Sequence, residues 1–438
     1  MIDKKAETIE ATAAPAIETD VLAAMSRPSL PYLAAVAACA LLFLGGLTLW
    51  GYQLARGLGV AGITHPVGWG VYITNFVFWV GIAHSGTLIS AVLFLFRARF
   101  RTSFNRSAEA MTVFALMVAG LFPLIHLGRV QIFYYLLPYP SQRLIWPNFR
   151  SPLVWDVFAV STYMIVSLVF FYAGMVPDLA IARRRFAGIR KKIYGFFSLG
   201  WQGNQRQWRH YAQLYLFLAA FATPLVASVH SIVSWDFAVS IIPGWHTTIF
   251  APYFVAGAIF SGTAMVITLM VPMRRMLHLK HYITDDHFEA IAKILLFTSL
   301  IVTFAYIVEH GLSFYGHSPF EHDQYLYRVL GDYWVLFGIM ILCNSLLPLT
   351  LFVRRLRRNI VWLFVLSILV NIGMWVERFV IIVASLANDF DPYAWGVYRP
   401  SFVEIGITAG SFGLFFLLFL LFVKLIPVLA ITEIKGHS

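Results

Sequence analysis

Long apolar segments separated by short polar ones make up most of this chain. Ten of these segments reach about 20 residues, the length that an α-helix needs to cross a ~30 Å hydrocarbon core. They lack the strict alternation of apolar and polar positions that marks barrel strands, so we expect helices. The pattern predicts an all-α polytopic membrane protein with about ten transmembrane helices, near residues 33–55, 68–96, 108–128, 154–182, 211–240, 250–273, 288–312, 329–352, 360–387 and 402–427. Long loops are expected only at 137–153, 183–210 and 313–328.

Two stretches about 176 residues apart repeat each other, which indicates duplication of a multi-helix unit. The first copy holds Gly68-Trp69, Phe78, Gly81, His84 and Ser85-Gly86-Thr87; the second holds Gly244-Trp245, Phe254, Gly257, Phe260 and Ser261-Gly262-Thr263. The same offset relates Arg99 to Arg275 and Asp156 to Asp332. We predict two tandem parallel four-helix bundles and read the Ser-Gly-Thr triplets as packing devices. The expected divisions are an N-terminal segment (1–30), a flanking helix (31–60), a first bundle (61–242), a second bundle (243–390) and a last helix with its tail (391–438).

Composition and charge agree with the membrane class and give an orientation. Apolar residues make up 60% of the chain and the mean hydropathy is +0.75. Arginine and lysine gather in the connections after the second, fourth, sixth and eighth helices, including Arg97 to Arg106, Arg183 to Lys192 and Arg354 to Arg358. The positive-inside rule therefore places both termini in the cytoplasm. The net charge of +11 is accounted for by these clusters, so nucleic-acid binding is not expected.

Other features of the sequence argue against an iron–sulfur cluster, a haem, a metal site and a cleaved signal peptide. The two cysteines, Cys39 and Cys343, are too few to ligate an iron–sulfur cluster. The first 30 residues have no apolar core behind a basic start, so no cleaved signal peptide is expected. Interior histidines at unmatched depths, one on each of three helices, disfavour a bis-histidine haem, and no metal site is expected.

The ionisable residues within the apolar segments point to function, because each costs several kcal/mol in a bilayer unless it has a partner or a purpose. His126, Asp156, His230 and Asp236 lie near the outer ends of the third, fourth and fifth helices. We predict that they converge on one outward-opening pocket. A histidine beside a carboxylate suits reversible proton transfer, and apolar walls suit a hydroquinone ring and its tail.

The remaining ionisable residues allow both functional and structural interpretations. Glu309, His310, Asp332 and Glu404 can be solvated helix ends. Glu377 and Arg378 are adjacent and point about 100° apart, which favours structural contacts with other helices. His84 lies deeper and is either functional or a satisfied core residue; its replacement by Phe260 in the second copy favours function.

Three strings resemble the NrfD/PsrC family of integral membrane subunits, which react with quinones beside an iron–sulfur partner. They are the stretch from His84-Ser-Gly-Thr to Arg97-Ala-Arg99 and Arg106, the stretch Leu121-Phe-Pro-Leu-Ile-His126-Leu-Gly-Arg129, and the stretch Trp146-Pro-Asn-Phe-Arg150 to Trp155-Asp156 and Tyr163. The likeness is greatest to the ActC-type membrane subunits of alternative complex III, of which ActF is a paralogue.

The resemblance implies a menaquinol or ubiquinol site near the positive side of the first bundle, in a bacterial cytoplasmic membrane. It implies catalytic roles for His126 and Asp156, supported by Asp236 and His230. It further implies that quinol is bound by Arg129, Trp155, Tyr163 and His84. A proton path is implied more weakly, through His84, Glu377, Asp332, Glu309 and His310. The implied partners are a periplasmic iron–sulfur subunit that takes the electrons, multihaem cytochrome c subunits, a paralogous membrane subunit and a cytochrome oxidase.

Two alternatives remain open. One is the quinone-reactive membrane anchor of a molybdopterin oxidoreductase of the polysulfide reductase type. The other is a secondary transporter, which would break helices at matched positions of both halves. Pro224 lies within a helix, but its counterpart at the repeat offset, Pro400, lies in a loop, and this disfavours the transporter. The loop from Pro138 to Pro152, rich in proline and aromatic residues, is either a stiff docking cap or an interfacial aromatic belt.

Overall fold

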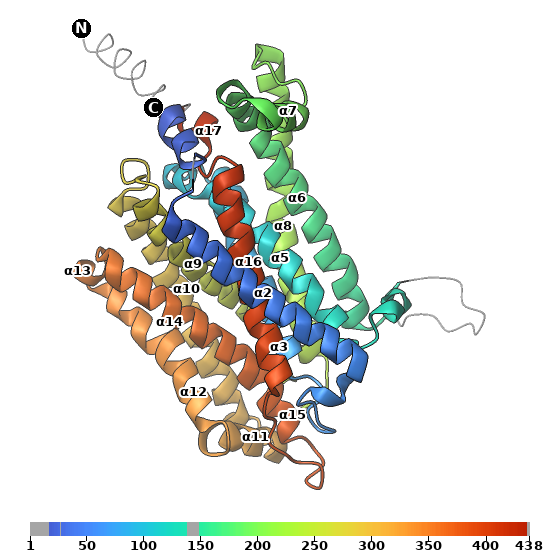
Figure 1. Ribbon diagram of the computed structural model, residues 1–438. Coiled ribbons are helices and arrows are strands. Elements are labelled where there is room, and N and C mark those ends of the chain that lie inside the picture. The colour runs from blue at the N-terminus through green and yellow to red at the C-terminus, as the bar shows by residue number, and fades with distance from the viewer. Residues whose placement is uncertain (1–16, 27, 138–148, 436–438) are drawn as a thin grey trace.

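The computed structural model describes residues 17–26, 28–137 and 149–435, and within them the chain is all-α with ten helices of membrane-spanning length (Figure 1). The expected helices are confirmed, with ends shifted by a few residues. Their bounds are α2 Leu30–Arg56, α3 Val71–Thr87 with its continuation to Leu95, α5 Asn105–His126, α6 Pro152–Arg185, α8 Gln205–Ala238, α9 Phe250–Met276, α10 Asp285–Tyr315, α12 Trp334–Ile341 with its continuation to Phe352, α14 Ile360–Phe379 with its continuation to Ala387, and α16 Phe402–Leu425.

Shorter helices fill two of the regions that were expected to be loops. The connection at 183–210 contains α7 (Gly188–Phe197), and the connection at 313–328 contains α11 (Pro319–Leu330). Both are too short and too polar for a membrane-length search to find. Most of the proline-rich loop, residues 138–148, lies outside the described residues, so its role as a cap or belt stays a prediction.

The membrane helices pack in two groups that meet along α3 and α9. Helices α3, α5, α6 and α8 contact one another in the first group, and α9, α10, α12 and α14 in the second. Helix α2 crosses α16 along one side of the molecule (Figure 1). The proposed division of the chain near residue 242 follows this grouping but stays a prediction.

The two repeated triplets form the contact between α3 and α9. Ser85 Oγ donates a hydrogen bond to Ile259 O at 2.7 Å and lies 3.2 Å from Thr263 Oγ1. A Cβ atom on Gly262 would lie 2.7 Å from Ile82 O, so only glycine allows this approach. Duplicated small residues therefore bring the two groups together at their centre, as small-residue motifs do in membranes.

The two ends of the helices differ in charge. One end, called here the basic end, carries α7, α13 (Arg354–Arg357) and α17 (Ile431–Lys435), and the helical residues 17–24 lie there beside α17 through an ion pair of Glu18 with Lys435 (Figure 1). The opposite end, called here the pocket end, is where α5 and α8 terminate and α6 begins. The assignment of the basic end to the cytoplasm rests on the sequence alone.

We expect Gly262→Leu to lower the thermal stability of the detergent-solubilised protein, because over-packing a tight contact costs about 1–3 kcal/mol. The matched control is Gly338→Leu, since no atom lies within 4 Å of a Cβ at that helical glycine. Thermal unfolding of both variants measures the difference. Equal melting temperatures for the two variants would show that the triplet contact is not the one that joins the groups.

Candidate functional site

A cavity large enough for a ring-shaped ligand lies at the pocket end of the first group. This cavity, the pocket, has a volume of about 550 Å³. His126 from α5, Asp156 from α6 and Asp236 from α8 line it. Apolar side chains form most of the remaining wall, including Trp69, Ile73, Phe76, Leu124, Leu127, Phe133, Val157 and Val160. Three ends of helices far apart in the sequence thus supply the polar groups of one apolar cavity.

The end of α5 is held in place from outside the first group. Pro123 lies in the last helical turn, and Gly128 has φ +66°, a left-handed conformation that lets the chain turn sharply after His126. Gln53, fully buried on α2, donates through Nε2 to Ile125 O at 3.0 Å, and Tyr72 in turn donates to Gln53 Oε1. Gln53 was not among the residues predicted from the sequence, although a polar residue near the end of an apolar run is a signal that could have found it.

The two aspartates of the pocket come from opposite ends of two helices. Pro152 opens α6 and places Asp156 near the start of this helix, while Asp236 lies in the last turn of α8. Both carboxyl groups line the same apolar cavity. Carboxyl groups in such a position can accept and release protons of a bound ligand.

Each of the three polar residues keeps an atom without a protein partner among the described residues. These atoms are His126 Nδ1, Asp156 Oδ1 and Asp236 Oδ1. A buried polar atom without a partner costs about 1–3 kcal/mol, so the pocket favours a ligand or water that supplies hydrogen bonds. Such a ligand would have polar groups at the edge of an apolar body.

His230 does not line the pocket, and this corrects the prediction that four side chains converge there. It lies six residues before Asp236 on α8, which puts the two side chains about 120° apart around the helix. Its ring packs against His84 with centroids 4.5 Å apart and against Phe254 at 5.8 Å. Neither of its ring nitrogens has a hydrogen-bond partner in the part of the chain that the structure describes.

His84 and Tyr163 belong to the same deeper layer as His230. His84 is fully buried, and its ring nitrogens lie 2.8 Å from Val80 O and 2.7 Å from Val226 O. The Tyr163 ring lies 5.4 Å from the His84 ring, and its hydroxyl group contacts Thr87 Oγ1 at 2.7 Å. This layer, called here the histidine layer, lies within the first group but outside the pocket.

Two other binding candidates also lie outside the pocket lining. Arg129 follows the turn at Gly128 and is exposed. Trp155 is half-buried beside Asp156, and its ring packs edge-on against Trp235 at 6.0 Å. Neighbouring positions on a helix point in different directions, so proximity in sequence to Asp156 did not place Trp155 in the cavity.

The pocket end of the second group has a smaller cavity of about 190 Å³, and a buried ion pair lies in its lining. Glu309 is buried and bonds Arg328 Nη1 at 2.7 Å, so the expectation of a solvated helix end is wrong for Glu309. Arg328 also donates to Ser385 Oγ at 2.7 Å. Glu321 on α11 accepts from Gly244 N at 2.9 Å, and burial raises the pKa of its carboxyl group. The ion pair leaves this cavity less able to bind and deprotonate a neutral ligand.

The other members of the expected proton path are dispersed over the second group. Glu377 is fully buried, accepts from Tyr306 and from Asn344 Nδ2 at 3.2 Å, and forms an ion pair with Arg378 at 3.1 Å, so the adjacent pair does interact. The His310 ring packs on Tyr325 and Phe337. Asp332 accepts a hydrogen bond from the Tyr327 hydroxyl group at 3.3 Å. Glu404 is also buried, and its Oε2 accepts from Gly62 N at 2.7 Å, so Glu404 is not a solvated helix end.

Comparison with known proteins identifies the family. Residues 59–388 match the family described as polysulphide reductase, NrfD. The chain belongs to the NrfD family. A membrane protein of Halobacterium salinarum, named as the membrane subunit of a dimethyl sulfoxide reductase, is 27% identical over 402 residues, 85% of this chain and 86% of its own length. A protein of Mesobacillus selenatarsenatis, named as one of the subunits of a selenate reductase, is 23% identical over 397 residues, 86% of this chain and 89% of its own length. This NrfD-family chain is thus a multi-pass membrane protein related to membrane subunits of reductase complexes.

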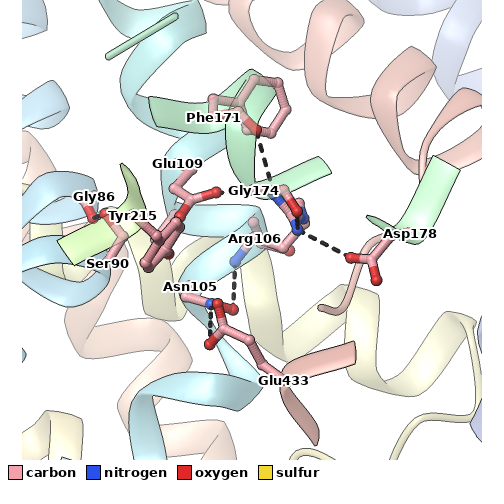
Figure 2. A network of polar contacts seen from close by, with 12 residues as sticks. Gly86, Ser90, Asn105, Arg106, Glu109, Phe171, Gly174, Asp178, Tyr215 and Glu433 are labelled. Atoms are coloured by element: carbon pink, nitrogen blue, oxygen red, sulfur yellow. Dashed lines mark hydrogen bonds and ion pairs between the residues drawn. The ribbon is translucent and has the colours of Figure 1, made fainter. Parts of the chain in front are cut away.

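A second polar cluster of the NrfD-family chain lies at the basic end of the first group (Figure 2). Arg106 of α5 bonds Glu109 Oε2 at 3.1 Å, Asp178 Oδ2 at 2.9 Å and Gly174 O at 2.6 Å. The Tyr215 hydroxyl group of α8 donates to Glu109 Oε1 at 2.9 Å. Arg106 was counted among the loop charges of the sequence, but its side chain is 2% exposed, so this interpretation is wrong.

The C-terminal segment closes this cluster from the basic end. Thr432 N donates to Asp178 Oδ1 at 3.1 Å, and Glu433 accepts from Asn105 Nδ2 at 3.0 Å and from Arg101 Nη2 at 2.8 Å (Figure 2 shows Glu433 beside Asn105). No pattern in the sequence indicates that α17 returns to α5. The buried carboxylates of Glu109 and Asp178 therefore have partners within the protein, unlike the open carboxylate atoms of the pocket.

We expect Arg106→Met to destabilise the protein strongly, because removing one partner of a buried ion pair costs about 3–5 kcal/mol. Adding Glu109→Gln and Asp178→Asn should recover part of the loss by removing the unpaired charges. Thermal unfolding in detergent measures both effects. The control is Lys293→Met, which breaks an ion pair with Glu289 whose lysine side chain is 62% exposed. A single variant as stable as the control would contradict the structural role of the cluster.

Proposed function

We propose that this chain is the quinol-oxidising membrane subunit of a respiratory oxidoreductase complex. The observation that carries the proposal is the pocket, where His126 Nδ1, Asp156 Oδ1 and Asp236 Oδ1 have no partner among the described residues inside an apolar cavity. Membership of the NrfD family and the names of its relatives, which are subunits of dimethyl sulfoxide and selenate reductases, support an oxidoreductase setting.

The pocket residues fit the chemistry of menaquinol or ubiquinol. The apolar walls hold the ring, and its hydroxyl groups donate to the open acceptors at the polar edge. Oxidation of one quinol to the quinone releases two protons and two electrons. In this mechanism His126 accepts one proton and the Asp156–Asp236 pair accepts the other, and both pass them to the nearby pocket end.

The electrons must leave the chain through a partner. An iron–sulfur cluster needs about four thiolate ligands, and this chain has only two cysteines, which lie on different helices. We therefore propose that an iron–sulfur subunit docks at the pocket end, which is the periplasmic side if the basic end is cytoplasmic. Multihaem cytochrome c subunits, a paralogous membrane subunit and a cytochrome oxidase complete the assembly in the alternative complex III version of the proposal.

Proton passage toward the basic end is a separate proposal. The histidine layer of the first group and the buried Glu309 and Glu377 of the second group provide its candidate residues, with His310 beside them. Asp332 contributes less to such a path, because its side chain is exposed and it lies just before the start of α12 at Trp334. A transporter mechanism gains no support from the pocket, which belongs to one group only.

We expect Asp156→Asn and His126→Ala each to lower quinol oxidation by the assembled complex by at least about 100-fold, since a positioned proton acceptor contributes roughly 10²–10⁴-fold. Initial rates with a short-chain quinol and an artificial electron acceptor give the measurement. The control is Asp323→Asn, which removes an exposed carboxylate from α11 at the same end. Wild-type rates in both pocket variants would remove the assignment.

The partner proposal predicts what co-purifies with the chain from native membranes. Alternative complex III requires a cysteine-rich iron–sulfur protein together with covalently bound c-type haem, detectable by haem staining and mass spectrometry. The quinone-reactive anchor of a molybdopterin oxidoreductase requires a molybdopterin subunit instead, and its recovery without c-type haem would overturn the alternative complex III version.

A further inference from the structure

A second cavity lies away from the pocket, between α14 and α16, with α3 and α9 behind it. It has a volume of about 410 Å³. Helices α14 and α16 barely touch each other, although both contact α3, and this leaves the space between them. Ile368 and Ile372 on its rim are 37% and 47% exposed, so the cavity opens to the lipid-facing surface. We call it the midplane cavity, because its residues lie near the middle of their helices.

Four of the nine described residues that line the midplane cavity are aromatic. Phe78 of α3, Trp375 of α14, and Phe412 and Phe416 of α16 line it. The Trp375 Nε1 group donates to Asn75 Oδ1 at 2.8 Å, so this indole offers only its apolar ring to the cavity. The described residues that line the cavity include no charged side chain. The cavity is therefore suited to a flat apolar ring rather than to a charged group.

One polar atom in the lining has no partner among the described residues, and its orientation is fixed. Asn371 is 9% exposed, and its Nδ2 group donates to Ser367 O at 2.9 Å. A backbone carbonyl can only accept, so the amide cannot be turned around without losing this bond. Asn371 Oδ1 is consequently left open.

The neighbouring hydroxyl groups do not satisfy this oxygen. Thr268 Oγ1 accepts from Asn371 Nδ2 at 3.4 Å, and it lies 3.0 Å from Ala264 O and 2.8 Å from Ser367 Oγ. Ser367 Oγ donates in turn to Phe364 O at 2.8 Å. An unpartnered acceptor inside a membrane calls for a donor that the lipid tails cannot supply. A ligand with a hydroxyl group on an apolar ring supplies one.

We propose that the midplane cavity is a second binding site for quinol, in which a ring hydroxyl group donates to Asn371 Oδ1 and the ring packs among the four aromatic side chains. The identity of the ligand rests on the proposed function, because quinol is the hydroxyl-bearing ring lipid that this function requires. The lining residues carry no titratable side chain, so the cavity binds without reacting. It selects the reduced form, since the oxidised quinone has no ring hydroxyl group to donate.

The test is equilibrium binding of a short-chain quinol to the intact complex in lipid nanodiscs, under reducing conditions. The wild-type complex is expected to show two binding events per chain. Asn371→Leu, which keeps the shape and removes the acceptor, should lose one event and retain turnover at saturating quinol. Ile372→Trp, which fills the cavity and keeps Asn371 in the sequence, should also lose one event and retain turnover. Val361→Trp, at a site on α14 that is 72% exposed, is the control.

The outcomes separate this proposal from the proposed function. His126→Ala should remove the binding event at the pocket and abolish turnover, while the binding event at the midplane cavity remains. A loss of turnover therefore does not count against the second site. One binding event in the wild type, or two in both cavity variants, would overturn the second site. Release of phospholipid and not quinol by Ile372→Trp would identify an acyl chain as the occupant and would equally overturn it.

Discussion

A polar atom buried in a membrane is stable only if the protein or a ligand gives it a hydrogen-bond partner, and the arrangement of this chain follows from that constraint. Most of the strongly charged side chains within the helices meet the requirement among themselves. Arg106 is surrounded by Glu109, Asp178 and backbone carbonyls, and Arg328 is held by Glu309 and Ser385. The pocket is different, because it gathers His126, Asp156 and Asp236 around an apolar cavity whose described lining includes no lysine or arginine, and an atom on each of the three has no partner among the described residues.

The repeat in the sequence suggests how one half of the molecule can carry such a site. Both halves keep the small residues that let α3 and α9 approach closely, so the packing of the two groups is preserved. The polar residues have diverged around this common contact. Phe260 fills the position that corresponds to His84, and an ion pair occupies the pocket end of the second group. The pocket thus belongs to the first group, while the matching end of the second group holds an ion pair.

The length and spacing of the apolar segments were enough to predict the ten helices, because a segment that spans a bilayer has few alternatives to the helix. The meeting of His126, Asp156 and Asp236 was also predictable, since helix ends at one face of a bundle must lie close together. The place of His230 was not, because it depends on the rotation of α8 about its axis. Arg106 and Glu433 illustrate a second limit: a charge beside an apolar segment looks solvated unless the return of a distant segment such as α17 is known.

The most direct test of the pocket as a quinol site is an experimental structure of the intact complex with a quinol-site inhibitor or quinol bound. We expect ring density in the pocket, with one ring oxygen within about 3 Å of His126 Nδ1 or of an open aspartate oxygen, the distance of a hydrogen bond. Ring density at another place in the first group, with only acyl chains between His126, Asp156 and Asp236, would contradict it.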